Sequence, residues 1–319
     1  MTPETQAWSE HWQRTLVGSI DLHAEDPVAS ALREQWARHL HRLKACEQIV
    51  DVGSGPAILA RLMERLGWSI QAPQAWWCLD QAQLGQAWQH ALPSGVRIRE
   101  QTPFQLAQPE QGPVDALVSN FGLEYLDLQA LAQALPRWLK PQAQLRAVLH
   151  AKDSVIDAAS TEHIADLQLA LQELQLPQRA QALAQAMATA PLDSMARMMH
   201  GVEVRDAYNE AVDRLKQVME ARGRASAVLM DLLRGITNSL RDVGRIGAKE
   251  PIQRIQSQAS AYQAELSRLR QMQASALDEK QAQAWRDTLG AAVPGGRALT
   301  LSPVECHLGR VAWNLSSAD

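Results

Sequence analysis

The sequence is poor in cysteine, which excludes two common ways of stabilising a chain. Its 319 residues include three cysteines, which are Cys46, Cys78 and Cys306. Their odd number and wide spacing match neither a disulfide framework nor a zinc-binding motif. We therefore expect no metal site, and we expect the protein to work in a reducing compartment.

The sequence also lacks a strong excess of one charge and lacks long hydrophobic runs. It has 31 Lys and Arg against 35 Asp and Glu, a net charge of −4. This balance gives no general attraction to a polyanion, so we do not expect nucleic acid as a partner. No apolar run approaches the ~20 residues of a membrane-spanning helix, and the first residues are polar. These features predict a cytoplasmic protein without a membrane span.

The first part of the chain is predicted to be helical. Residues 1–45 carry apolar side chains at steps of three and four, as from Ala29 to Leu43. Trp8 and Trp12 form a pair with the same spacing further upstream. Such spacing places the apolar side chains on one face of a helix. We therefore predict an N-terminal helical segment.

After this segment, strand and helix patterns alternate along the chain. The predicted strands are 48–52, 75–80, 95–100, 115–120 and 144–150, followed near the end of the chain by the pair 297–308 and 310–317. Alternation of this kind predicts an α/β fold, in which a parallel sheet is covered by helices on both faces. Because the strand pattern returns at the end, 46–158 and 296–319 are expected to form one core.

A long helical stretch separates the two parts of this core. Residues 159–295 show no strand pattern until their last few residues and are rich in Ala, Leu, Gln and Arg. Within them, 252–269 carry a short heptad pattern, and 247–251 contain the turn residues Gly and Pro. We therefore predict a helical insertion containing a hairpin, which would serve as a lid or as the arm of a homodimer.

A glycine-containing loop follows the first predicted strand. The segment DVGSGPA, residues 51–57, joins that strand to a helix. Glycine is suited to tight turns and to close approach of a ligand to the backbone. In an open parallel sheet, ligands bind at the carboxyl ends of the strands. Asp80 ends the next predicted strand, where a carboxylate can accept hydrogen bonds from two ribose hydroxyls.

These residues resemble the class I S-adenosylmethionine-dependent methyltransferases. The glycine-rich first motif of that family stands here as DVGSGPA, with Ala57 at the third glycine position. Segments 112–126 and 135–150 resemble the fourth-strand region and the helix and strand that end the family's conserved core, although Gln142 follows Pro141 where glycine is usual. The resemblance implies a Rossmann-like sheet of seven strands, five parallel and two in a terminal antiparallel hairpin.

The resemblance also implies a cofactor, S-adenosylmethionine, and the residues that bind it. Asp51 would hold the amino group of the cofactor, and Asp80 its ribose. The loop after the third strand, here Glu100 to Thr102, would contact the adenine, and Asn120 would border the methyl group. The complete set of implied cofactor-binding residues is Asp51, Gly53, Ser54, Gly55, Asp80, Gln81, Gln101, Thr102 and Asn120.

A dinucleotide-binding Rossmann domain is the alternative explanation of the loop. It usually has glycine at the sixth position of the motif and continues through six parallel strands. The predicted antiparallel pair at the end of the chain favours the methyltransferase fold. A third interpretation is that the glycines serve only a tight turn between a strand and a helix.

Three residues are candidates for catalysis. The Asn/Asp-Pro-Pro-aromatic signature of amino-group methylation in DNA and of protein-glutamine methylation is absent, as is a Pro-Cys nucleophile. His150 ends the fifth predicted strand and has a side chain that titrates near neutral pH, which suits a general base. Glu124 and Tyr125 are the other candidates. A hydrogen-bonded structural role is the alternative for His150.

The function predicted from the sequence is methyl transfer to a small-molecule acceptor, on oxygen or nitrogen. A methyltransferase that acts on tRNA or protein is the second hypothesis. It would be favoured by a continuous basic face on the insertion, formed by Arg214, Arg222, Arg224, Arg234, Arg241 and Arg245. A non-catalytic scaffold that keeps the fold is the third.

Overall fold

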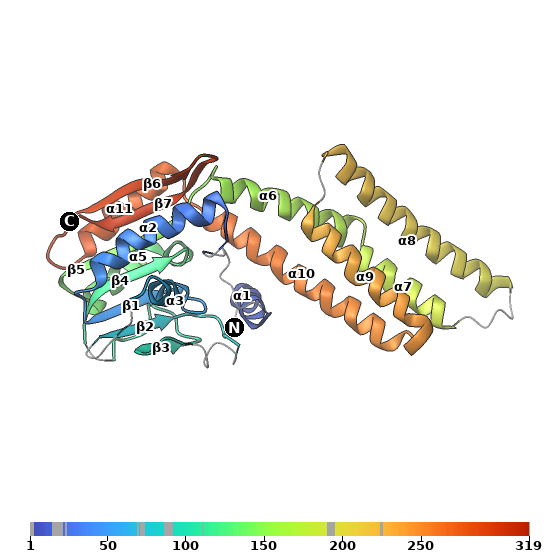
Figure 1. Ribbon diagram of the computed structural model, residues 1–319, viewed down its shortest axis with the longest axis horizontal. Coiled ribbons are helices and arrows are strands. Elements are labelled where there is room, and N and C mark those ends of the chain that lie inside the picture. Colours follow the sequence, from blue (N-terminus) through green and yellow to red (C-terminus); the bar gives the residue numbers. More distant parts are fainter. Residues whose placement is uncertain are drawn as a thin grey trace. The chain divides into compact units, whose positions relative to one another are not determined.

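The computed structural model describes residues 3–14, 22, 24–68, 70, 74–85, 92–110, 112–189, 195–223 and 226–318. The chain divides into two compact units (Figure 1). A sheet unit consists of Met1–Ala159 and Gln271–Asp319, and a helical unit consists of Ser160–Arg270. Each unit is considered by itself below.

A sheet of seven strands forms the centre of the sheet unit. The strands are β1 (Gln48–Val52), β2 (Ala75–Leu79), β3 (Val96–Arg99), β4 (Val114–Asn120), β5 (Leu139–His150), β6 (Leu299–Cys306) and β7 (Gly309–Ser317). Their order is β3-β2-β1-β4-β5-β7-β6. The first five are parallel, and β7 pairs antiparallel with both β5 and β6. The predicted Rossmann-like methyltransferase sheet is therefore confirmed.

The strands are buried on both faces, which explains their nearly continuous apolar sequences. Neighbouring residues point to opposite faces: Val50 and Trp77 belong to one apolar cluster, whereas Ile49 and Trp76 belong to the other. Helices α2 (Pro27–Leu43) and α3 (Ile58–Arg65) cover the face that carries Ile49. Helices α5 (Leu128–Trp138) and α11 (Glu279–Ala292) cover the face that carries Val50. Each fully buried leucine contributes about 1.5–3 kcal/mol to this packing.

Helix α2 has clear sequence signals for its start and its buried face. Asp26 accepts hydrogen bonds from the backbone N–H groups of Val28 and Ala29, and Pro27 occupies the first turn. The face that packs on the sheet includes Leu32, Trp36 and His39, all buried. This packing brings the Trp36 indole to the end of β4, where it contacts the site described below.

The helical unit is made of helices among its described residues. They are η2 (Leu169–Glu173), α7 (Leu176–Thr189), α8 (Met195–Ala221) and α9 (Ala227–Ile246), with parts of α6 (Val155–Gln168) and α10 (Lys249–Ser275). Helices α9 and α10 form the predicted hairpin. Asp242 pairs with Arg254 at 2.7 Å, and Tyr262 donates a hydrogen bond to Asp231. Gly247, with a φ of 78°, ends α9.

The two compact units differ in their boundaries from the predicted segments. The insertion was expected to cover 159–295, but α11 packs against the sheet through Trp285 and Leu289. Helices α1 (Pro3–Arg14) and α2 likewise belong to the sheet unit. Part of the predicted segment 1–45, namely residues 1–2, 15–21 and 23, lies outside the described residues. No helix among the described residues is long and apolar enough to span a membrane.

Candidate active site

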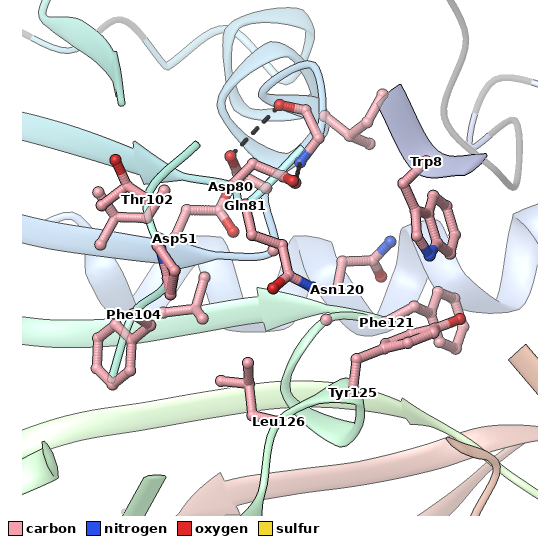
Figure 2. Close-up of a pocket in the computed structure, with 18 of the residues that line it drawn as sticks. Trp8, Asp51, Asp80, Gln81, Thr102, Phe104, Asn120, Phe121, Tyr125 and Leu126 are labelled. Carbon is pink, nitrogen blue, oxygen red and sulfur yellow. Dashed lines mark hydrogen bonds between the residues drawn. The ribbon is translucent and has the colours of Figure 1, made fainter. Parts of the chain in front are cut away.

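A pocket lies at the carboxyl ends of β1, β2 and β4 (Figure 2). It encloses about 890 Å³, including the space at its open side. Acidic and polar side chains from the ends of β1 and β2 line one end. Aromatic side chains from α1 and from the loop after β4 line the other, where Figure 2 shows Trp8, Phe121 and Tyr125 together. The position agrees with the rule for ligand sites in open α/β sheets.

The two glycines of the 51–57 loop are required by the backbone conformation and by close packing within the protein, before any ligand is considered. Gly53 and Gly55 both have positive φ, 64° and 49°. A Cβ atom on Gly53 would lie 2.7 Å from the Cα of Gly122, and one on Gly55 would lie 2.7 Å from the Trp12 ring. Both distances are shorter than real contacts, so a side chain at either position would displace a neighbouring segment. Both glycines also line the pocket.

The two positions where the family usually has glycine retain the backbone of glycine here. Ala57 has a φ of 58° and a ψ of 43°, which is the left-handed conformation, directly before α3. Gln142 has a φ of 64°. A residue with a side chain pays about 1–2 kcal/mol for this conformation. Both residues therefore occupy a left-handed turn that glycine would adopt without strain.

Asp80 joins the end of β2 to the glycine loop. Its carboxylate accepts hydrogen bonds from the backbone N–H of Gly55 at 2.8 Å and of Ala82 at 2.8 Å. Burial raises the pKa of Asp80 to about 6, the two backbone hydrogen bonds oppose this rise, and the charge of Glu100 adds to it. Asp80 is thus a structural acceptor as well as a pocket residue.

Asp51 is the most unusual polar group of the pocket. It is 1% exposed, and neither carboxylate oxygen has a hydrogen-bond partner of normal geometry among the described residues. Burial raises the pKa of Asp51 well above its ordinary value, the nearby Trp76 indole opposes this rise, and the charge of Asp80 adds to it. A buried carboxyl group without partners is costly. The group therefore fits a ligand that brings its own hydrogen-bond donors.

The other predicted cofactor residues differ in where they lie. Ser54, Gln81 and Thr102 line the pocket. Gln101 is exposed and does not line it, and the carboxylate of Glu100 accepts the backbone N–H of Leu84 at 3.0 Å. Of the three residues expected to contact adenine, Thr102 is thus the one at the pocket wall.

Asn120 is held in a defined orientation from outside the pocket. Its Oδ1 accepts a hydrogen bond of 2.7 Å from the Trp36 indole N–H. Because the amide oxygen is engaged, the Nδ2 group is the part of the side chain left to donate to a ligand. Asn120 lines the pocket between its two ends (Figure 2). Asn120 was predicted from the sequence to lie in the site, but its hydrogen bond with Trp36 of α2 was not.

The three candidate catalytic residues separate into a wall residue and two residues behind the wall. Tyr125 lines the pocket, whereas Glu124 and His150 do not. The His150 ring stacks on Phe121, with ring centroids 4.2 Å apart, and is 3% exposed. The Glu124 carboxylate accepts the backbone N–H of His150 at 2.8 Å. A side chain that does not reach the pocket cannot take a proton directly from an acceptor bound there.

Glu124 is nevertheless strongly perturbed. Its second oxygen, Oε2, is buried without a hydrogen-bond partner among the described residues. Burial raises the pKa of Glu124 to about 8, although the hydrogen bond from the His150 backbone opposes this rise. The group is therefore a neutral carboxylic acid at neutral pH in the folded protein.

Apart from Tyr125, the aromatic residues at this end of the pocket were not predicted from the sequence. Trp8 stacks on Trp12 with centroids 5.7 Å apart and meets Tyr125 edge to face at 5.5 Å. Phe121 follows β4 and has a φ of 58°. The spacing of Trp8 and Trp12 predicted a helix face, but no local pattern indicates which pocket a terminal helix will cover.

Comparison with known proteins gives little further guidance. No family model matches the sequence, and no curated protein sequence matches it. Among solved structures, geranyl diphosphate C-methyltransferase from Streptomyces coelicolor is 18% identical, with a TM-score of 0.34, over 47% of this chain and 66% of that one. Phosphoethanolamine N-methyltransferase 1 from Haemonchus contortus is 15% identical, with a TM-score of 0.31, over 48% and 34%.

A structure of another class matches over a greater length. A protein described as a Zn-dependent alcohol dehydrogenase from Rhodobacter sphaeroides is 13% identical, with a TM-score of 0.45, over 100% of this chain and 99% of that one. The match to each of the two methyltransferases spans less than two thirds of the matched protein. What this chain does is therefore inferred from its own residues.

Proposed function

We propose that the protein transfers a methyl group from S-adenosylmethionine to a small molecule. The observation that carries the proposal is the pair of carboxylates, Asp51 and Asp80, at the ends of adjacent strands beside a glycine loop. Asp51 is buried at the pocket wall, and neither of its oxygens has a hydrogen-bond partner of normal geometry among the described residues, which suits the amino group of the cofactor. Asp80 is suited to the two ribose hydroxyls.

The remaining wall residues are compatible with the same cofactor. Thr102 and the buried ring of Phe104 line the pocket beyond Asp80, where a planar base would lie against an apolar surface. Asn120 offers its amide Nδ2 group between the two ends. When bound, the cofactor supplies a methyl group on a positively charged sulfur, which makes that group transferable.

The contribution of the protein to such a reaction would be alignment and exclusion of water. Trp8 and Tyr125 form an aromatic wall at the end of the pocket away from Asp80. Tyr125 remains the candidate for direct contact with the acceptor. His150 and Glu124, which lie behind the wall, would act by supporting Phe121 and the loop after β4.

A small acceptor is favoured over tRNA by the charges of the helical unit. Several of the arginines that could form a basic face pair with acids: Arg222 with Asp166, Arg234 with Asp231 and Arg245 with Asp242. Arg224 lies outside the described residues. Paired arginines are less available for phosphate groups. The proposal includes transfer to oxygen or to nitrogen, and the helical unit would serve as a lid or as a dimer arm.

The proposal is tested by calorimetric titration of the full chain with S-adenosylhomocysteine and, separately, with NAD. We expect saturable binding of the first and none of the second. Binding of NAD alone would favour a dinucleotide site. Binding of neither would favour the scaffold hypothesis. Asp115→Asn is the matched control for an Asp80→Asn variant. Like Asp80, Asp115 accepts two backbone N–H groups, but it lies outside the pocket. The Asp115→Asn variant should bind like the wild type.

A further inference from the structure

The aromatic end of the pocket is formed by Trp8, Trp12, Phe121 and Tyr125. The rings come from two distant segments of the chain, α1 and the loop after β4. They contact one another in stacked and edge-to-face arrangements at 5.5–5.7 Å between Trp8 and its two neighbours. Ring pairs with this geometry are favourable and well ordered. The aromatic end is therefore a defined surface.

Aromatic residues are concentrated here in a chain that has few of them. Aromatic residues make up 5% of the sequence, and both of its phenylalanines, Phe104 and Phe121, line this pocket. Phe104 stacks on Trp138 at the acidic end, with centroids 4.9 Å apart. The other phenylalanine, Phe121, sits in a left-handed conformation. Holding a bulky side chain in this conformation is costly, and such strain is typical of functional positions.

The charges around the pocket restrict what this surface can bind. Among the described residues that line it, the charged side chains are Asp51 and Asp80, and none is Lys, Arg or His. A carboxylate or phosphate group would thus be desolvated near two acids without a compensating cation. Both acids lie at the opposite end, where the cofactor is proposed to bind, so no acid of the lining is left to pair with a cationic acceptor.

We propose that the aromatic end is the acceptor subsite and that it takes an uncharged, planar aromatic compound. The inference rests on the function proposed above, because it assigns the acidic end to the cofactor. Trp8, Phe121 and Tyr125 would supply ring surface to the acceptor, and Tyr125 also carries a hydroxyl group. An acceptor carrying a hydroxyl or neutral amine would enter with its ring against these residues.

The test uses three probes that share one ring system. The full chain, saturated with S-adenosylhomocysteine, is titrated with 2-naphthol, 2-naphthoate and naphthylmethylammonium, and binding is followed by calorimetry and by saturation-transfer NMR. We expect 2-naphthol to bind at least tenfold more tightly than either charged probe. Preferred binding of the anion or of the cation would overturn the proposed acceptor class. Failure of all three to bind would overturn the subsite.

Variants locate the probe. Trp8→Ala should weaken 2-naphthol about tenfold, since a stacked ring pair and its buried area are lost, whereas Trp8→Phe should restore most of the affinity. Trp68 is the matched control because it is half-buried but absent from the pocket, and Trp68→Ala should not change the affinity. Equal loss in both alanine variants would contradict the location.

The two proposals can fail separately. If S-adenosylhomocysteine binds but no naphthalene probe does, the acceptor subsite is wrong and the cofactor site stands. If S-adenosylhomocysteine does not bind, the methyltransferase proposal fails. In that case titration of the unliganded protein with 2-naphthol still decides whether the aromatic surface binds a ring.

Discussion

The two ends of the pocket are built by different physical means. At the acidic end, Asp80 is fixed by backbone N–H groups, and the oxygens of the buried Asp51 have no hydrogen-bond partner of normal geometry among the described residues. At the aromatic end, rings from two segments hold one another by stacking and edge contacts. Ligand affinity at the acidic end should therefore change with single-atom substitutions and with pH. Ligand affinity at the aromatic end should change when ring surface is removed. The predictions below test this difference, from the largest expected effect to the smallest.

Glu124 lies behind the aromatic end and should make the stability of the fold, rather than the binding of a ring, depend on pH. Its pKa is about 8 in the fold against 4.5 for an ordinary Glu, so the folded state keeps a proton that the unfolded chain loses. Stability from this group is complete below about pH 4.5 and falls as pH rises toward 8, by on the order of 1.4 kcal/mol per pH unit. Glu124→Gln should remove that loss, on the order of 4 kcal/mol in total.

The measurement is urea unfolding of wild type and Glu124→Gln at pH 5 and pH 8. The amide oxygen of Gln can still accept the backbone N–H of His150. We expect the variant to gain stability relative to the wild type at the higher pH. Parallel changes in the two proteins would show that Glu124 titrates as an ordinary Glu and would contradict the prediction.

Asp80 tests the acidic end directly. Asp80→Asn should weaken S-adenosylhomocysteine about 100-fold, because hydrogen bonds to a charged acceptor contribute about 1.5–3 kcal/mol each. Asn is the better substitution than Ala, since its one amide oxygen can still accept either the N–H of Gly55 or that of Ala82, whereas Ala would leave both without an acceptor. Calorimetry should show 2-naphthol affinity unchanged. Equal loss for both ligands would mean that the two ends are not independent.

The same residue predicts a pH dependence of binding. With a pKa of about 6, Asp80 is largely ionised at pH 7 and largely protonated at pH 5. The wild-type affinity for S-adenosylhomocysteine should fall roughly tenfold between these values, and the Asp80→Asn variant should lose this component. A wild-type profile that matches the variant would refute the assignment to Asp80.

A substitution at Trp36 tests whether the orientation of Asn120, which lies between the two ends of the pocket, matters for cofactor binding. Trp36→Phe removes the indole N–H that engages Asn120 Oδ1 while keeping an aromatic ring. The loss of one hydrogen bond should weaken cofactor binding by about 1 kcal/mol, or roughly fivefold. Trp68→Phe is the control, since Trp68 is half-buried and does not line the pocket. Equal effects would indicate packing rather than orientation of Asn120.

Ala57 gives the smallest expected effect. Its left-handed conformation is strained, so Ala57→Gly should relieve about 1 kcal/mol. The greater freedom of glycine in the unfolded chain offsets part of this gain, and a net stabilisation of about 0.5 kcal/mol is expected in thermal unfolding. Affinity for both ligands should stay the same. A loss of stability would mean that the Ala57 methyl group has a packing role.

The sheet was predictable because its signals are local. Each predicted strand is present, and the terminal hairpin was visible as two short apolar patterns separated by a turn. The acidic end was predictable for a related reason, since Asp51 and Asp80 directly follow or end buried runs. The left-handed turn at Ala57, by contrast, could not be predicted from the sequence, because only its φ angle shows this conformation.

The aromatic end was not predictable, because it depends on contacts between distant segments. Trp12 is near Gly55 only after α1 has packed on the loop, and Trp36 meets Asn120 over 84 positions of sequence. His150 was expected in the site since it ends a strand of the sheet. The stacking of its ring on Phe121 places it behind the wall instead.

Gly53 and Gly122 meet back to back, and this contact joins the first loop of the sheet to the loop that carries Phe121 and Tyr125. Neither loop can shift far without colliding with the other. Two residues usually associated with backbone freedom therefore stiffen the place where both ligands would touch. A ligand that bridges these loops would find them already arranged, so that little backbone entropy is lost when it binds.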